Sequence, residues 1–134
     1  DFNGDTREAL KHGWILNYQD GLDQARKLRK PMMLVFGAEY CGFCKKLERT
    51  TLENAQLAKY INNTFVCVHI DVEEQEKVAQ ILEVKSLPCT IILSPDADLL
   101  GRFEGYMQPS PMYQKLVAAN KLHLDAQVTA GVTR

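Results

Sequence analysis

The stretch that decides the fold is residues 32–46, which read MMLVFGAEYCGFCKK. Its first five residues are all apolar and predict a buried strand, and the segment after the second cysteine predicts a helix. A Cys-x-x-Cys sequence at a strand-to-helix junction is the arrangement that reversible dithiol–disulfide chemistry needs. Two intervening residues let one helical turn bring the sulfurs of Cys41 and Cys44 within bonding distance. The helix N-terminus then stabilises a thiolate on Cys41.

The composition of the chain is that of one globular domain. It has 134 residues, of which 46% are hydrophobic, so it can fill a core. The net charge of -1 does not indicate a nucleic-acid surface, and the basic run at residues 26–30 is interpreted as a solvated helix face. No run approaches the ~18 apolar residues of a membrane span. Because the chain begins at Asp1 rather than Met, we expect that a preceding segment was removed, which is weak support for an exported protein.

Hydrophobic spacing and turn residues predict alternating strands and helices along the rest of the chain. The predicted strands are residues 14–16, 32–37, 65–71, 90–93 and 99–103. The predicted helices are residues 20–29, 41–52, 54–61, 73–82 and 110–122. Asp20 and Asn54 are the expected N-caps of two of these helices.

This order of elements predicts a mixed three-layer α/β domain, with parallel strands joined by helices and a closing antiparallel hairpin. Residues 1–13 are expected to be an N-terminal extension, residues 14–122 the domain, and residues 123–134 a loosely ordered C-terminal tail. The strand at 65–71 is apolar at nearly every position, which favours a central place in a covered sheet.

Three features resemble the thioredoxin superfamily over residues 14–120. Residues 36–46 look like the thioredoxin active-site segment, residues 70–72 like the end of its central strand, and residues 84–88 like its cis-proline loop. Residues 101–105 match its hairpin and trailing glycine. The resemblance implies a thioredoxin fold, a mixed central sheet covered by helices on both faces. The chain is most similar to exported or membrane-tethered thioredoxin-like proteins, including the C-terminal domain of the transmembrane disulfide reductase.

The resemblance implies distinct roles for the two cysteines. Cys41 would be the nucleophile, with its pKa lowered by the helix N-terminus and by the nearby Lys45 and Lys46. Cys44 would be the buried resolving thiol. A metal site is the alternative, but a Cys₄ zinc site needs a second close pair, and Cys67 and Cys89 are far apart in the sequence. We therefore expect no metal and no cofactor beyond the redox-active Cys41–Cys44 disulfide.

A substrate-binding surface is also implied by the resemblance. Pro88 would follow a cis peptide bond, so that the backbone of Leu87 could pair with an extended substrate chain, as in strand addition. Tyr40, Phe43 and Leu87 would form an apolar rim beside the nucleophile, and Gly42 would lie in the same surface. An apolar rim suits extended protein segments better than a small charged thiol.

Two positions depart from the thioredoxin pattern. Val35 stands where thioredoxin has a buried Asp that helps to move the proton of the resolving thiol, and Glu39 in the same loop is expected to face solvent. The hypothesis is that Cys44 loses its proton through water, so that Val35→Asp should speed disulfide reduction at pH 7. Phe43 replaces a Pro between the cysteines, so the thioredoxin reduction potential cannot be carried across.

The remaining cysteines and the strand histidine have alternative interpretations. Cys67 is interpreted as a core residue, because free Cys behaves as a small hydrophobe. Cys89 is interpreted as a buried strand residue, with a third redox thiol near Cys41 as the alternative. His69 is interpreted as a structural histidine rather than a proton shuttle.

The predicted function is a thiol–disulfide oxidoreductase that reduces protein disulfides. The expected partners are disulfide-containing proteins and an upstream thiol donor, for which a membrane-tethered protein is a candidate. The chain is expected to be a monomer. The alternatives are a disulfide isomerase or oxidant, a non-catalytic binding module, and a glutathione-using enzyme. The expected location is periplasmic or otherwise extracytoplasmic, with the cytoplasm as the alternative.

Overall fold

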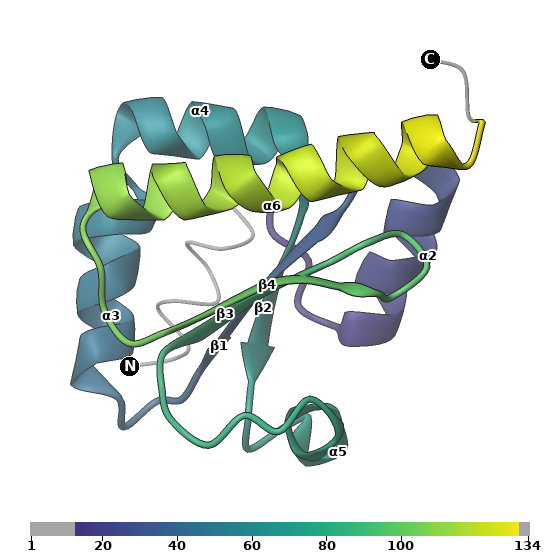
Figure 1. Cartoon of the computed structure of the whole chain (residues 1–134). Coiled ribbons are helices and arrows are strands. Elements are labelled where there is room, and N and C mark those ends of the chain that lie inside the picture. Colours follow the sequence, from purple (N-terminus) through teal and green to yellow (C-terminus); the bar gives the residue numbers. More distant parts are fainter. Residues whose placement is uncertain (1–12, 132–134) are drawn as a thin grey trace.

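A computed structural model describes residues 13–131 of the chain (Figure 1). The predicted extension therefore lies, except for Gly13, outside the described residues. Four strands form one sheet: β1 (Met32–Gly37), β2 (Val66–Asp71), β3 (Cys89–Leu93) and β4 (Leu99–Glu104). Their order is β2-β1-β3-β4. Strand β1 is parallel to β2 and antiparallel to β3, and β3 is antiparallel to β4, which confirms the mixed sheet and the closing hairpin.

Helices cover both faces of this sheet (Figure 1). They are α2 (Tyr18–Leu28), α3 (Gly42–Leu47), the π-helix η1 (Glu48–Leu52), α4 (Ala55–Thr64), α5 (Glu76–Ile81) and α6 (Pro109–Thr129). On one face, Leu47 of α3, Leu57 of α4 and Met112 of α6 share a core cluster. On the other, Leu22 of α2 and Ala79 of α5 share a second cluster. The predicted three-layer arrangement is confirmed.

The predicted central place of residues 65–71 is wrong for the four-stranded sheet. Strand β2 lies at its edge, and on its outer side only Ile15 among the described residues forms a bridge, to Val68. Two backbone hydrogen bonds join Ile15 to β2. The Ile15 N–H donates to the Cys67 carbonyl, and the His69 N–H donates to the Ile15 carbonyl, each at 2.8 Å. The predicted strand at 14–16 is therefore a single bridge. Helices bury both faces of β2, which makes its sequence apolar wherever it lies in the sheet.

Two helices also differ from the predicted ones. Helix α2 begins before Asp20, because Asn17 is the N-cap and its side chain accepts from the Asp20 N–H at 3.0 Å. Helix α6 continues to Thr129, so the prediction of a loose tail from residue 123 is wrong for its described part. His123 and Gln127 are buried at four-residue spacing, which continues the inward face of the helix with polar residues that a hydrophobic pattern misses. The predicted Asn54 cap is confirmed, since its side chain accepts from the Leu57 N–H at 3.0 Å.

Candidate active site

The two cysteines of the Cys-x-x-Cys sequence lie where β1 has ended and α3 begins. Cys41 is the N-cap of α3, and its Sγ accepts a hydrogen bond from the Cys44 N–H at 3.1 Å. The pair forms a disulfide, with the two Cα atoms 5.3 Å apart. A free backbone N–H at a helix start is an electrostatic partner for a thiolate, so reduction of this disulfide leaves the Cys41 sulfur in a place that stabilises negative charge.

The sulfurs are shielded, but the residues beside them are not. Cys41 and Cys44 are 9% and 3% exposed, whereas Tyr40 and Phe43 are 72% and 63% exposed. Large apolar side chains in solvent mark a surface that another molecule can cover. The exposure matches the predicted rim, and its contact with a substrate stays a prediction. Gly42 is exposed between the two cysteines.

The loop before β3 completes the site from a distant part of the chain. The Leu87–Pro88 peptide bond is cis, as predicted. Leu87 packs against the cluster formed by Ala38 and the two cysteines. The Pro88 carbonyl accepts from the Gly105 N–H at 2.8 Å, so the residue after β4 is bonded to this loop. The fold thus brings the cysteines and the cis-proline loop together.

A family model of the thioredoxin-like domain matches residues 18–120. The chain belongs to this thioredoxin-like family. The match confirms the superfamily and fold predicted from the sequence, and it covers all four strands of the sheet.

Known proteins similar to this thioredoxin-like chain include several Dsb proteins. The thioredoxin-related protein DsbJ of Chlamydia pneumoniae is 28% identical to this chain over the aligned region. The alignment includes 67% of this chain but only 29% of the length of DsbJ. The solved structure of DsbH oxidoreductase superimposes with a TM-score of 0.72 at 17% identity. The superposition includes 81% of this chain and 84% of the DsbH chain. The oxidised C-terminal domain of DsbD from Neisseria meningitidis has a TM-score of 0.65 at 18% identity, with coverages of 75% and 94%. At these identities the solved structures show the fold.

Two features of the thioredoxin-like site were missed by sequence reasoning. Val72, directly after β2, packs against the cysteine cluster. Tyr106, after β4, lies under Lys46, whose Nζ is 4.5 Å from the ring centroid, and its hydroxyl is 2.8 Å from that of Thr50. The hydrogen bond with Thr50 is the main cause that lowers the pKa of Tyr106. Gly105, which follows β4 and matches the family pattern, was the sequence feature that could have pointed to Tyr106.

The charged residues predicted to support the site lie at its margin. Lys45 is half-buried in the last turn of α3, and Glu39 is exposed, as expected for a side chain that faces solvent. Val35 is buried in the core below α3, at 2% exposure, so the position of the thioredoxin carboxylate is apolar in this chain.

The other two cysteines are buried in strands and remain free thiols. Burial raises the pKa of Cys67 to about 12, a shift that Lys30 opposes only in part. Burial is also the main cause that raises the pKa of Cys89. Cys89 packs in the cluster on the α2 and α5 side of the sheet, whereas α3 packs on the opposite side through Leu47. These positions favour the interpretation of both thiols as core residues.

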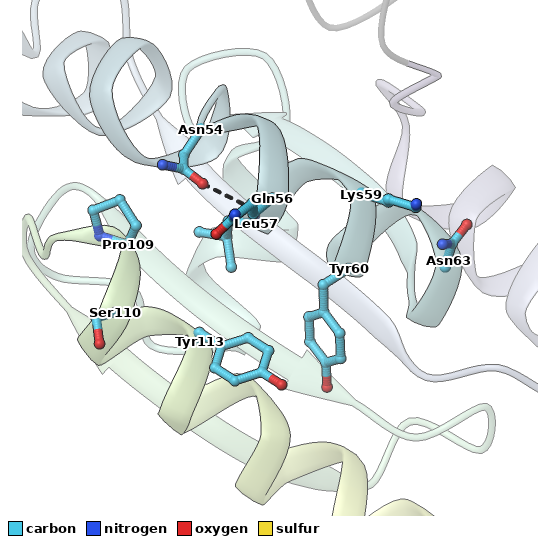
Figure 2. Close-up of a pocket in the computed structure, with 9 residues that line it drawn as sticks. All are labelled: Asn54, Gln56, Leu57, Lys59, Tyr60, Asn63, Pro109, Ser110 and Tyr113. Carbon is cyan, nitrogen blue, oxygen red and sulfur yellow. Dashed lines mark hydrogen bonds between the residues drawn. The ribbon is translucent and has the colours of Figure 1, made fainter.

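A separate groove lies between α4 and α6, and none of the predicted site residues lines it. Its volume is about 620 Å³, and Figure 2 shows Tyr60 of α4 and Tyr113 of α6 projecting toward one another across it. Their rings meet edge to face with centroids 4.9 Å apart. No cysteine lines this groove, so the candidate active site is the surface around Cys41 and Cys44.

The described residues provide neither a cluster of metal ligands nor a membrane-spanning helix. Within residues 13–131, no group of three or more His, Cys, Asp or Glu side chains is placed to hold a metal ion. In the same part of the chain, no helix combines the length and the apolar character that crossing a bilayer requires.

Proposed function

We propose that this thioredoxin-like domain reduces protein disulfides. The observation that carries the proposal is the position of Cys41, whose sulfur accepts a backbone N–H at the start of α3 beside exposed apolar side chains. In the dithiol form, the Cys41 thiolate attacks one sulfur of a substrate disulfide, and the other substrate sulfur leaves as a thiolate and takes up a proton. Cys44 then attacks Cys41, which forms the protein disulfide and releases the first substrate sulfur.

The rim and the cis-proline loop support a protein as the substrate. Tyr40 and Phe43 offer apolar area next to the nucleophile, and an extended chain could lie along the Leu87 backbone as an added strand. No metal or organic cofactor enters this cycle, because the two electrons reside in the cysteine pair. An upstream thiol protein must restore the dithiol after each turnover.

The proposed location is extracytoplasmic, and the likeness to the thioredoxin-related protein DsbJ supports it. An oxidising compartment has no general thiol pool that would keep such a pair reduced, so a dedicated donor, which can be membrane-tethered, is required. Fractionation of cells that produce the full-length protein tests the location, and recovery in the cytoplasm alone would contradict it.

The reduction potential of the Cys41–Cys44 pair tests the direction of electron flow. The protein is equilibrated in dithiothreitol or glutathione buffers, its thiols are alkylated, and the alkylated thiols are counted by mass. A value near or below about -250 mV supports a reductase, whereas a value above about -200 mV indicates an isomerase or an oxidant. A pair that forms no disulfide in any buffer would contradict a redox function and leave a binding module as the alternative.

A further inference from the structure

A buried pair of titratable side chains lies beneath the Cys-x-x-Cys helix. His69 Nε2 is 3.2 Å from Glu48 Oε2, and the two side chains are only 3% and 12% exposed. Removing two ionisable groups from water costs more than their attraction commonly returns, so such a pair is weak as a stabilising device. Strongly desolvated ionisable pairs near a cleft are also where proton-transfer groups are found.

Glu48 is tied to the resolving cysteine through the backbone. Its N–H donates to the carbonyls of Cys44 and Lys45, so helical geometry continues from α3 into η1. Residues four apart on a helix lie on the same face, which places the Glu48 side chain on the face of Cys44. This is the inward face, because Cys44 and Leu47 are both buried.

His69 approaches the same place from the sheet. It lies on β2 directly opposite Val35 of β1 in the parallel register. Val35 points into the core cluster that also contains Leu47, and His69 reaches Glu48 on that side. The position opposite the histidine therefore carries no carboxylate, and Glu48 supplies one from the helix above.

Few other titratable groups face this place from the described elements. By strand alternation, Cys67 and Asp71 of β2 point to the same face of the sheet as His69. The high pKa of Cys67, about 12, keeps it a thiol, and the Asp71 carboxylate already accepts from the Glu73 N–H at 2.8 Å. On α3, Lys45 is the half-buried cation, and β1 offers only apolar side chains.

The resolving step needs a proton acceptor here. Cys44 is 3% exposed, and burial disfavours a thiolate, so the proton must pass to a group inside the site before the sulfur can attack. We propose that Glu48, oriented by His69, accepts the proton of Cys44 when the mixed disulfide is resolved, in place of the water route hypothesised from the sequence. The Cys44 sulfur then bonds to that of Cys41, the Cys41–substrate bond breaks, and its electron pair leaves on the substrate sulfur. Glu48 returns the proton to solvent or to that sulfur. Glu48 acts on the reacting thiol, and His69 is a positioning residue.

This proposal rests on the proposed function, and one experiment separates the two. The reduced protein is mixed with an excess of 5,5′-dithiobis(2-nitrobenzoate), and release of thionitrobenzoate is followed by stopped flow over a range of pH. Attack by Cys41 releases the first equivalent, and resolution by Cys44 releases the second. The variant Cys44→Ser identifies the phases, because it keeps the first and loses the second.

The expected result is a selective change in the second phase. Glu48→Gln slows the second phase by about 10²-fold near neutral pH, which is the low end of what general-base catalysis contributes. The rate of the second phase in this variant then rises steadily with hydroxide concentration. Glu53→Gln, an exposed acid one residue beyond η1, is the matched control and leaves both phases unchanged. His69→Gln slows the second phase and leaves the first unchanged, because the Glu48 carboxylate has lost the side chain that orients it.

A rescue variant guards against a merely structural effect. Val35→Asp in the Glu48→Gln background restores a carboxylate opposite His69 and should recover part of the second-phase rate. If the second phase of Glu48→Gln keeps the wild-type rate and pH profile, the role proposed for Glu48 is overturned. The proposed function still stands in that case, because the wild-type protein shows both phases. Absence of both phases in the wild-type protein would instead contradict the proposed function itself.

Discussion

The four cysteines form two contrasting groups, one at the start of a helix and one inside strands. Cys41 and Cys44 share a disulfide where the Cys44 N–H donates to the Cys41 sulfur and exposed aromatic residues flank the pair. Cys67 and Cys89 lie in β2 and β3, where burial raises the pKa of both thiols. The same side chain is therefore a reactive group in one place and a small apolar filler in the other. Backbone geometry and solvation make the difference.

The largest effect that this comparison predicts is on turnover. Cys41→Ser should lower the rate of disulfide reduction by about 10³-fold or more, because it removes the covalent nucleophile. Cys89→Ala is the matched substitution among the buried thiols and should leave the rate within a few-fold of the wild type. Reduction of insulin in the presence of dithiothreitol measures both. A comparable loss in Cys89→Ala would show that the strand thiol takes part in the chemistry.

The next effect is on stability and concerns the helix that carries the reactive pair. Leu47 of α3 is fully buried in the core cluster beneath the helix. Leu47→Ala should lower the free energy of unfolding by about 2–5 kcal/mol through lost burial and the cavity it leaves. Urea denaturation of the oxidised protein measures the change, with exposed Leu99→Ala as the control for side-chain type. A loss below 1 kcal/mol, on the order of a surface substitution, would mean that α3 is held mainly by other contacts.

The buried thiols should make stability depend on alkaline pH. The pKa of Cys67 rises from 9.0 to about 12 on folding, so between these values the unfolded chain binds fewer protons at this group than the folded protein. Its contribution to stability is complete below pH 9 and is lost progressively as the pH approaches 12. From pH 8 to pH 10 the loss should be about 1.4 kcal/mol.

Urea denaturation of the oxidised wild type and of Cys67→Ala at the two pH values measures this loss. The variant should lack this part of the pH dependence, whatever its stability at pH 8. Equal pH dependence in the two proteins would show that Cys67 ionises as readily in the fold as in the unfolded chain.

The smallest effect compares two helix N-caps. The cap of α3 is the sulfur of Cys41, whereas the cap of α4 is the amide oxygen of Asn54, which accepts from the Leu57 N–H at 3.0 Å. Asn54→Ala should destabilise the protein by about 1 kcal/mol and leave thiol reactivity unchanged, whereas Asn54→Ser should retain most of the stability. Thermal denaturation and alkylation rates measure the two effects. Loss of thiol reactivity in Asn54→Ala would indicate that α4 governs the order of α3.

Much of the fold could be predicted because its signals are local. The apolar run before the cysteines, the Asn54 cap and the turn before β4 each depend on residues close in sequence. The extent of α6 could not be predicted in this way, because the burial of His123 and Gln127 depends on what the helix packs against. The position of β2 within the sheet could not be predicted either. A strand covered on both faces has the same apolar sequence pattern at the edge of a sheet as at its centre.

The candidate site likewise has a part that depends on local sequence and a part that depends on tertiary packing. The sequence by itself determined the reactive pair, since the spacing of Cys41 and Cys44 at a strand-to-helix junction already specifies a disulfide at a helix start. Only the tertiary structure decided what surrounds that pair. It brought Leu87 against the cysteines and placed Glu48 beside His69, 21 residues away in the chain. Contacts between elements depend on how strands and helices pack, and no local pattern of residues encodes which buried carboxylate will meet which histidine.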